Sequence, residues 1–261
     1  MSTRPGGAGP GSVLARGREA VIHDAGQGRV LRRYLDVSRS TELEAGVMVH
    51  LAEHGFPVPS VIDASGPDLL MSRVDGPTML DDAGRRPWRL RAHARTLADL
   101  HHRLHGLPVS SGLRAPFGQP EAILHLDLHP ANVLLGPEGP VVIDWTNVSA
   151  GPAAIDEAQT WLLLATSEIP ATGLERRILA LARGIFLRAL LARLGRDAAC
   201  CRLPLVAQLR QLDPHVTDTE RREIAALLDR LDLEAAAVGA PSRASGADRR
   251  PPDVGTPGRD A

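Results

Sequence analysis

The spacing of apolar and polar positions changes character once along the chain. Up to Val74, short apolar pieces alternate with turn sequences such as the one at 24–28, which is typical of β-strands. One helix is predicted among them, from Thr41 to His54, because its apolar side chains recur at helical spacing. The predicted strands lie at 13–14, 20–22, 30–31, 61–62 and 69–74.

Helical periodicity dominates after the break at 75–77. Pro87 is placed to begin a helix, and Gly106 is placed to end it. A β-hairpin is expected near residues 132–144, where two apolar runs flank a Gly/Pro turn. Further helices are predicted at 153–167, 173–195, 203–212 and 218–236.

These two halves define the expected domain organisation. Residues 13–74 are predicted to form a small β-rich lobe and residues 75–237 a larger, mostly helical lobe, which makes the fold class α+β. Residues 1–12 and 238–261 are rich in Gly, Pro, Ser, Arg and Asp and lack apolar periodicity. Both segments are therefore expected to be disordered tails.

The composition and net charge of the chain limit the classes of function that we expect. The chain has 261 residues, 43% of them hydrophobic, and a net charge of −1, so neither a nucleic-acid nor a membrane partner is indicated. The adjacent Cys200 and Cys201 favour a reduced, cytoplasmic protein, and the first residues do not resemble a signal peptide. All 30 basic residues are Arg, because the chain contains no Lys. The oligomeric state is not predicted.

The segment from 123 to 145 carries the strongest chemical signal. If Leu135 pairs with Val141 in the predicted hairpin, Asn132 lies opposite Asp144 at its open end. Opposed residues in an antiparallel pair have Cα atoms about 4.5–5.5 Å apart. An amide oxygen and a carboxylate at that spacing would form an oxygen site suited to Mg²⁺ and substrate phosphates.

Asp127 precedes Asn132 by five residues, on a loop stiffened by Pro130. A carboxylate beside the metal can accept the proton of an incoming hydroxyl. The spacing His-x-Asp-x-x-x-x-Asn, followed by Asp144 after an apolar strand, is the layout of phosphoryl-transfer enzymes. The alternative is a merely polar hairpin, with Asp127 as a turn residue, Asn132 as a cap and Asp144 as a strand terminator.

The motif His125-Leu-Asp127-Leu-His-Pro-Ala-Asn132, followed by Val-Ile-Asp144-Trp145, resembles the aminoglycoside phosphotransferase and choline kinase-like family, relatives of the protein kinases. Asp-Trp in place of Asp-Phe-Gly favours that branch over the protein kinases. The resemblance implies a two-lobed protein-kinase-like fold, with ATP or GTP bound by the small lobe and a small hydroxylated acceptor bound by the helical lobe.

The same resemblance assigns roles to single residues. Asp127 would be the catalytic base, and Asn132 and Asp144 would bind the Mg²⁺ that accompanies the nucleotide. Asp156 would support the catalytic loop from a helix start, with His125 in the same supporting role. The alternative for Asp156 is a first-turn acid favoured by the helix dipole, and both interpretations can hold together.

Two residues of the small lobe resemble an ion pair of the family. Arg32 sits where the family has a strand lysine that contacts the α- and β-phosphates, and Glu44 resembles the helix glutamate that pairs with it. Arg forks onto phosphate oxygens but differs from Lys in reach and geometry. The alternatives are a solvated strand Arg32, as is expected for Arg33, and a capping box from Thr41 to Glu44.

Weaker signals complete the nucleotide site. Gly17 could begin a reduced phosphate loop with backbone N–H donors, although an ordinary hairpin is the alternative. The resemblance places Ser72 to Val74 at the linker that hydrogen-bonds the purine. These are cofactor-binding predictions, together with Arg32 and Glu44.

The leading function is an O-phosphotransferase that uses Mg²⁺ and ATP or GTP. Because Lys is missing and the glycine loop is sparse, a kinase-like binding module with little or no catalysis is the alternative. A zinc hydrolase is a remote third hypothesis. Its zinc ligands would come from His101 and His105, one helical turn apart, and from His125, Asp127 and His129. The acids of the acceptor region at 153–235 are balanced by Arg, so no polycationic acceptor is favoured.

Overall fold

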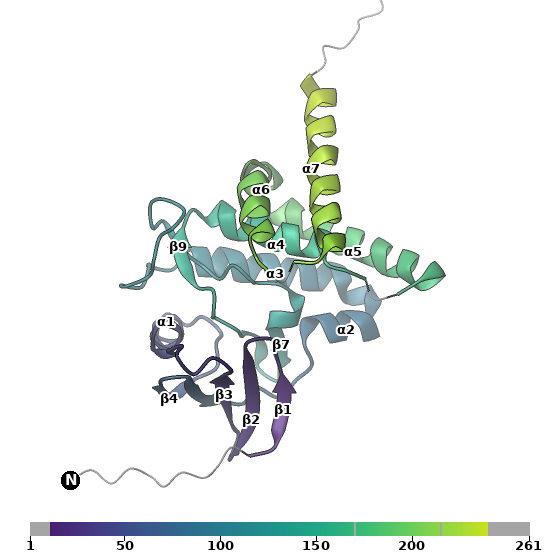
Figure 1. Cartoon of the computed structure of the whole chain (residues 1–261). Helices are drawn as coiled ribbons and strands as arrows, with labels where there is room; N and C mark the ends of the chain where they lie inside the picture. Colours follow the sequence, from purple (N-terminus) through teal and green to yellow (C-terminus); the bar gives the residue numbers. More distant parts are fainter. Residues whose placement is uncertain (1–10, 170, 215, 240–261) are drawn as a thin grey trace, which may run out of the picture.

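The computed structural model describes residues 11–169, 171–214 and 216–239. The two predicted tails, 1–12 and 238–261, lie outside the described residues except for two positions each. Figure 1 shows a β-sheet region formed by the first part of the chain and a larger helical region formed by the rest. The predicted α+β class is confirmed.

The small region is a five-stranded antiparallel sheet in the order β1-β2-β3-β5-β4. Alternation in β3 buries Val30, Arg32 and Tyr34 on one face. The only helix that the described residues place in this region, α1, buries Glu44 among apolar side chains. The bounds are β1 Val13–Arg16, β2 Ala20–Gly26, β3 Arg29–Tyr34, α1 Glu42–Glu53, β4 Val61–Ser65 and β5 Asp68–Ser72.

The helical region packs α3 against α5 and α4 against α6. One hydrophobic cluster joins α1 and β5 of the small region to α3 and the hairpin segment, and a second lies within the helical region. Helix α2 was not predicted, although Thr78 and Asp81 form a capping box at its start. Helix α6 begins at Arg196 rather than at 203. The bounds are α2 Met79–Arg85, α3 Leu90–His105, α4 Ala153–Thr166, α5 Gly173–Leu194, α6 Arg196–Gln211 and α7 Asp218–Gly239.

The segment from residue 122 to residue 151 contains four short strands. The predicted hairpin forms as β7 (Val133–Gly136) and β8 (Gly139–Val142), while β6 (Ala122–Leu124) pairs with β9 (Ser149–Gly151), a pair the sequence pattern did not predict. A 3-10 turn at Pro130–Asn132 leads into β7.

The predicted register of this hairpin is wrong by one residue. Leu135 pairs with Pro140 instead of Val141, because Gly136 pairs with Gly139 and leaves a two-residue loop, shorter than the turn assumed. A slip of one residue moves side chains to the opposite face. Asn132 is therefore opposite Ile143, whose N–H donates to the Asn132 carbonyl at 3.0 Å.

The linker between the two regions is bonded to this hairpin. The Leu135 N–H donates to the Pro77 carbonyl at 2.9 Å. Gly76 approaches so closely that a Cβ there would lie 2.1 Å from the Leu135 oxygen, which explains the glycine. On the other strand, the Val142 N–H donates to the carbonyl of Pro57, in the small region, at 2.8 Å. No helix in the described part of the chain is long and apolar enough to cross a membrane.

Candidate active site

Asp127 and Asn132 are locked together in the loop before β7. The Asn132 side-chain amide donates to the Asp127 carbonyl at 2.9 Å and to its carboxylate Oδ2 at 3.0 Å. Since only the NH₂ group can donate to both acceptors, the Asn132 Oδ1 is turned away from Asp127. Among the described residues, the amide oxygen of Asn132 accepts no hydrogen bond.

The surroundings of Asp127 keep it ionised. Its Oδ1 lies 3.3 Å from Nε2 of His129. Burial favours the neutral acid, but the hydrogen bond and charge of His129, with contributions from His125 and Asn132, outweigh it and lower the pKa of Asp127. At neutral pH the half-buried Asp127 carboxylate is therefore ionised and able to accept a hydrogen bond.

The side chain of His125 fixes the loop of residues 125–132 through hydrogen bonds and packing. It is fully buried, its Nε2 lies 3.1 Å from the Ile143 carbonyl, and its Nδ1 accepts from the Asp127 N–H at 3.2 Å. A carbonyl can only accept, so the proton of a neutral ring sits on Nε2. The ring also packs against Trp145, with centroids 4.5 Å apart. This geometry agrees with the supporting role predicted for His125.

Asp156, in the first turn of α4, fastens the same loop to the helix. Its carboxylate accepts from the N–H of Leu126 at 2.6 Å and from that of His125 at 3.2 Å. Burial opposes its ionisation, but the interactions of Asp156 with His101 and His105 outweigh burial, so the pKa of Asp156 lies well below its ordinary value. The loop-supporting and helix-start interpretations therefore describe the same side chain.

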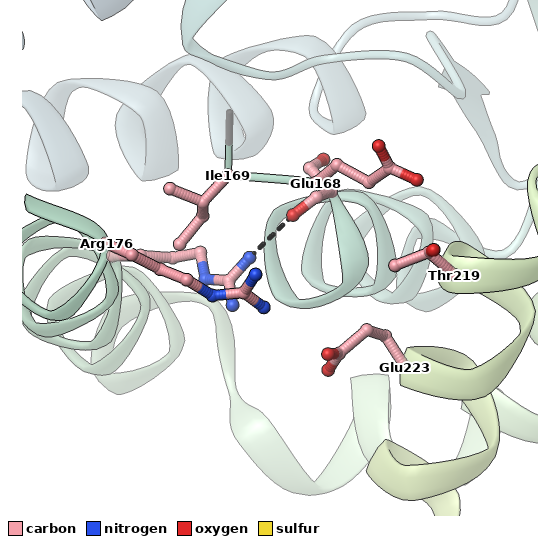
Figure 2. A pocket seen from close by; sticks show the side chains of 7 residues that line it. Glu168, Ile169, Arg176, Thr219 and Glu223 are labelled. Atoms are coloured by element: carbon pink, nitrogen blue, oxygen red, sulfur yellow. Dashed lines mark hydrogen bonds between the residues drawn. The ribbon is translucent and has the colours of Figure 1, made fainter. Parts of the chain in front are cut away.

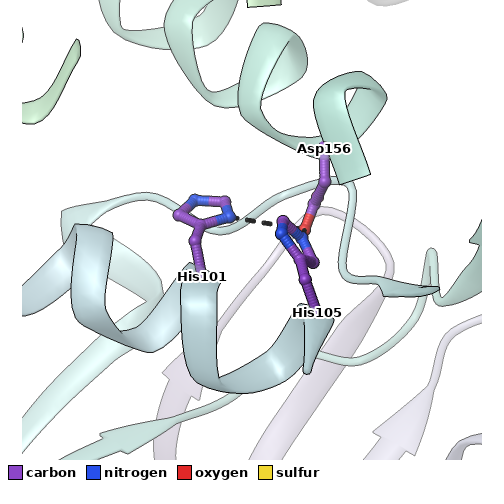
Figure 3. A group of neighbouring side chains, drawn as sticks. All are labelled: His101, His105 and Asp156. Atoms are coloured by element: carbon purple, nitrogen blue, oxygen red, sulfur yellow. Dashed lines mark hydrogen bonds and ion pairs between the residues drawn. The ribbon is translucent and has the colours of Figure 1, made fainter. Parts of the chain in front are cut away.

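Figure 3 shows the cluster formed by His101, His105 and Asp156. His105 Nε2 donates to Asp156 at 3.0 Å, while His101 Nδ1 lies 3.5 Å away, longer than an ordinary hydrogen bond. Burial and the nearby histidines lower the pKa of His101, against the pull of Asp156.

The predicted zinc grouping does not form as sketched. The potential ligand atoms of His101 and His105 lie within 4.8 Å of those of Asp156, not of the His125 to His129 segment. His101 and Asp156 have no exposed surface. A hydrolytic zinc site needs an open coordination position that a substrate can reach. This closed cluster offers none.

Asp144 terminates the extended segment after β8 with a left-handed backbone, φ 66°. Its Oδ1 accepts from the Thr146 hydroxyl at 2.6 Å and from Arg32 Nη2 at 3.0 Å. The side chain is 43% exposed. Among the described residues, no hydrogen bond joins the side chains of Asp144 and Asn132; the backbone bond between Ile143 and Asn132 is what brings the two chain segments together.

Arg32 and Glu44 form the ion pair that the family pattern implied. Arg32 Nη1 lies 2.5 and 2.6 Å from the two Glu44 oxygens, and the Tyr34 hydroxyl donates to Glu44 at 2.8 Å. Burial opposes the charge of Arg32, but Glu44 and Asp144 outweigh it and raise the pKa of Arg32. Arg32 thus bridges α1 and the Asp144 segment.

The alternative interpretations for these two residues are wrong. Arg32 is 6% exposed and therefore not a solvated strand residue. Thr41 makes no side-chain capping bond to the helix; its hydroxyl instead donates toward the carbonyls of Gly66 and Asp68. Arg33, expected to be solvated, contacts Asp68 at 2.5 Å on the half-exposed face of the sheet.

The remaining predicted residues lie at the edges of the sheet region. The Gly17 N–H donates to the Ala20 carbonyl at 2.9 Å and closes an ordinary hairpin turn, so this amide is already used inside the protein. Ser72 ends β5 opposite Arg29, and Val74 begins the linker, packed over Gly136. A role for Gly17, Ser72 and Val74 in nucleotide binding stays a prediction.

Sequence reasoning missed three members of the site. Tyr34 shares the buried face of β3 with Arg32, so period-two alternation could have found it. His105 lies one helical turn after His101 and could have been matched to Asp156 only with the fold in hand. Thr146 carries no pattern beyond its position two residues after Asp144.

The donor set fits a hard divalent cation. The amide oxygen of Asn132 and the exposed carboxylate of Asp144 are the ligand types that Mg²⁺ prefers, and Mg²⁺ keeps its other positions for water and phosphate. Asp144 is oriented by Thr146 and Arg32 at its Oδ1, which leaves Oδ2 as the side available to a ligand. These two residues would hold the ion.

Comparisons with solved structures give the same fold. A choline/ethanolamine kinase family protein from Mesorhizobium loti is 18% identical, with a TM-score of 0.51 and 89% of each chain covered. The amicoumacin kinase hAmiN, in complex with AMP-PNP, Ca²⁺ and Ami, is 13% identical, with a TM-score of 0.52 over 87% of this chain and 88% of that chain.

A third similar structure is the ADP-bound aminoglycoside phosphotransferase APH(2'')-Ib, 13% identical, with a TM-score of 0.54 over 83% of this chain and 90% of that chain. At these identities the likeness establishes a kinase-like phosphotransferase fold. No curated protein matches the chain. A family model described as the phosphotransferase enzyme family matches residues 13–114 and 112–196, well over half of the sequence. The chain belongs to this phosphotransferase enzyme family.

Proposed function

We propose that the protein transfers the γ-phosphoryl group of ATP or GTP to a hydroxyl of a small molecule. The observation that carries this proposal is the coupled geometry of three residues. An ionised Asp127 is bonded to Asn132, and Asp144 follows on the adjacent strand with its carboxylate open to solvent. Family membership supports a phosphotransferase, and the AMP-PNP and ADP in similar structures support the nucleotide.

In the proposed reaction the acceptor hydroxyl donates its hydrogen bond to Asp127. The hydroxyl oxygen bonds to the γ-phosphorus, the bond from that phosphorus to the bridging oxygen of the nucleoside diphosphate breaks, and the hydroxyl proton passes to Asp127. Because the pKa of Asp127 is depressed, this carboxylate is a weak base. Its main contribution is then to orient the hydroxyl, with the proton moving late.

The other groups neutralise phosphate charge. When bound at Asn132 and Asp144, Mg²⁺ would screen the β- and γ-phosphates. Arg32 reaches the same region through its Nη2 group, which lies 3.0 Å from Asp144. We assign the nucleotide to the lobe formed by 13–74 and the acceptor to the helical lobe of 75–237.

Asp144→Ala tests the proposal directly. Titration of the purified protein with ATP or GTP and Mg²⁺ should reveal binding that this variant loses. Asp63→Ala is the matched control, because Asp63 is an exposed acid on β4, away from the site. Intact Mg²⁺-dependent nucleotide binding in Asp144→Ala would refute the assignment.

A second candidate is a kinase-like binding module with little turnover. The observation in its favour is that both ends of the Arg32 guanidinium are engaged by carboxylates, Glu44 and Asp144, so little of it is free for phosphate. ATP turnover over a panel of hydroxylated acceptors separates the two functions. Activity that rises in Arg32→Lys would indicate a degenerate enzyme, whereas activity lost in Arg32→Ala and not raised in Arg32→Lys would indicate that Arg32 itself serves the reaction.

A further inference from the structure

A cavity of about 220 Å³ lies in the helical region, between the end of α4, the first half of α5 and the start of α7. Figure 2 shows Arg176 reaching into it from α5, with Thr219 and Glu223 facing from α7. Its lining is mainly polar and consists of Ser167, Glu168, Ile169, Arg176, Arg183, Thr219 and Glu223.

Two arginines share this cavity, and neither has a carboxylate of the described residues at ion-pair distance. Arg176 and Arg183 are seven residues apart on α5 and therefore on one face of the helix. Within the described ranges, no acid lies within the 4.0 Å of an ion pair to either of them. The Arg183 side chain donates to the Ser167 carbonyl at 2.8 Å, its one hydrogen bond to the part of the chain that the structure describes. The guanidinium groups of Arg176 and Arg183 therefore both line the cavity, and most of their N–H groups make no hydrogen bond to the described residues.

The charges around Arg183 do not balance. Burial lowers the pKa of Arg183, and the positive charges of Arg176 and Arg230 add to that effect, while Glu223 opposes it. Glu168, the other acid of the lining, already accepts from the Thr217 hydroxyl at 2.7 Å. The lining itself holds two arginines and two glutamates, and Arg230, which lies outside the lining, adds a third positive charge near Arg183 that an anion would compensate.

The cavity is separate from the candidate active site. Asp156 fastens the catalytic loop at the start of α4, whereas Ser167 follows the end of that helix. Eleven residues of α-helix span about 16 Å. An anion in the cavity is therefore not the nucleotide phosphate assigned to Asp144 and Arg32.

We propose that this cavity is a binding site for the oxyanion group of a small molecule, held by Arg176 and Arg183. Guanidinium groups bind phosphate and carboxylate oxygens through paired hydrogen bonds, and both chemistries suit two adjacent forks. The Thr219 hydroxyl can donate a further bond. The site does not depend on the phosphotransfer reaction and would be present in the nucleotide-free protein.

Calorimetric titration of the full, nucleotide-free chain with inorganic phosphate, and separately with acetate, tests this site. One saturable site is expected at low ionic strength, and the probe that binds more tightly identifies the preferred oxyanion. Arg176→Gln should weaken binding by about 10-fold or more, because it removes one charged fork. Arg176 is exposed and its side chain makes no hydrogen bond or ion pair to the described residues, so this variant should fold normally.

Arg177→Gln is the matched control, since Arg177 is the adjacent exposed arginine and does not line the cavity. Its affinity for the anion should be unchanged. Arg183→Lys, which keeps the charge and loses the fork, should give an intermediate loss. Arg32→Gln should leave this binding intact, which distinguishes it from phosphate bound at the nucleotide site.

Three results would overturn the proposal: no saturable binding of either anion, the same affinity in Arg176→Gln, or an equal loss in Arg177→Gln. Nucleotide binding is measured independently with Asp144→Ala. A protein that binds phosphate at Arg176 but no nucleotide would keep this site and lose the proposed function, and the reverse outcome is equally distinguishable.

Discussion

Two buried polar networks belong to the candidate site, one at the loop of residues 125–132 and one ending at Asp144, and they differ in how completely the protein satisfies them. At the loop, Asp156 has no exposed surface and accepts from two backbone amides and from His105. In the other network, Arg32 and Glu44 are buried, but the chain of contacts ends at Asp144, whose side chain is 43% exposed.

This difference distinguishes a carboxylate that stabilises the fold from one that is available to a ligand. A buried carboxylate whose acceptor positions are filled by its own chain serves to fix the fold. A carboxylate that is oriented through one oxygen and open at the other is held ready for a ligand. The network around Asp156 belongs to the first kind and the network ending at Asp144 to the second. Substitutions should therefore affect stability in one and activity in the other.

The largest effect is expected for Asp127→Asn, at the open side of the loop. Loss of the acceptor for the hydroxyl proton should reduce phosphoryl transfer by about 10²- to 10⁴-fold. Nucleotide binding should persist, because Asn132 and Asp144 are unchanged. Turnover and nucleotide titration of the same preparation check both points. Turnover near that of the unmodified protein would remove Asp127 from the reaction.

Next comes Asp156→Asn, in the closed network. An amide NH₂ would face the donors of His105 and His125, so we expect a loss of about 3–5 kcal/mol in the free energy of unfolding. The folded-state pKa of Asp156 is depressed, so its stabilisation is complete above the ordinary value of 3.8 and fades as pH falls below it.

Urea unfolding of the two proteins as a function of pH measures this effect. The stability gap should be full at neutral pH and shrink under acid conditions. A gap that stays constant down to pH values well below 3.8 would show that ionisation of Asp156 does not stabilise the fold.

A smaller effect is expected for Thr146→Val, which removes the hydroxyl that orients Asp144 and keeps the side-chain shape. The Mg²⁺ concentration needed for half-maximal activity should rise about 10-fold, since partners that orient metal ligands typically contribute 10- to 100-fold. Stability should fall by only about 1 kcal/mol. Thr172→Val is the control, because Thr172 makes no side-chain capping bond. An unchanged Mg²⁺ requirement would contradict the positioning role.

Local pattern was enough to predict most of the fold. Alternation and helical spacing predicted the β-rich small region and its one helix, whereas Arg32 was assigned from the family resemblance and its burial is seen only in the structure. The short pair β6 and β9 escaped because each strand has three residues, too few for a period to show. Helix α2 escaped because its seven residues carry mostly acidic and small side chains.

The candidate site was predictable by residue and not by geometry. The identities of Asp127, Asn132 and Asp144 followed from spacing, but the one-residue error in register misplaced Asn132 relative to Asp144. Turn length fixes hairpin register, and the Gly/Pro-rich turn allowed more than one length. The engagement of Arg32 by Asp144 joins residues 112 apart, and only the folded chain reveals such a contact.

The hairpin that precedes Asp144 is tied to the small region and to the linker at once. Pro57 holds one of its strands and Pro77 holds the other, each through a backbone hydrogen bond. Of these two bonds, only the one to Pro57 joins the hairpin to the small region, because Pro77 belongs to the linker. A displacement of Pro57 would therefore act first on β8, the strand that ends two residues before Asp144.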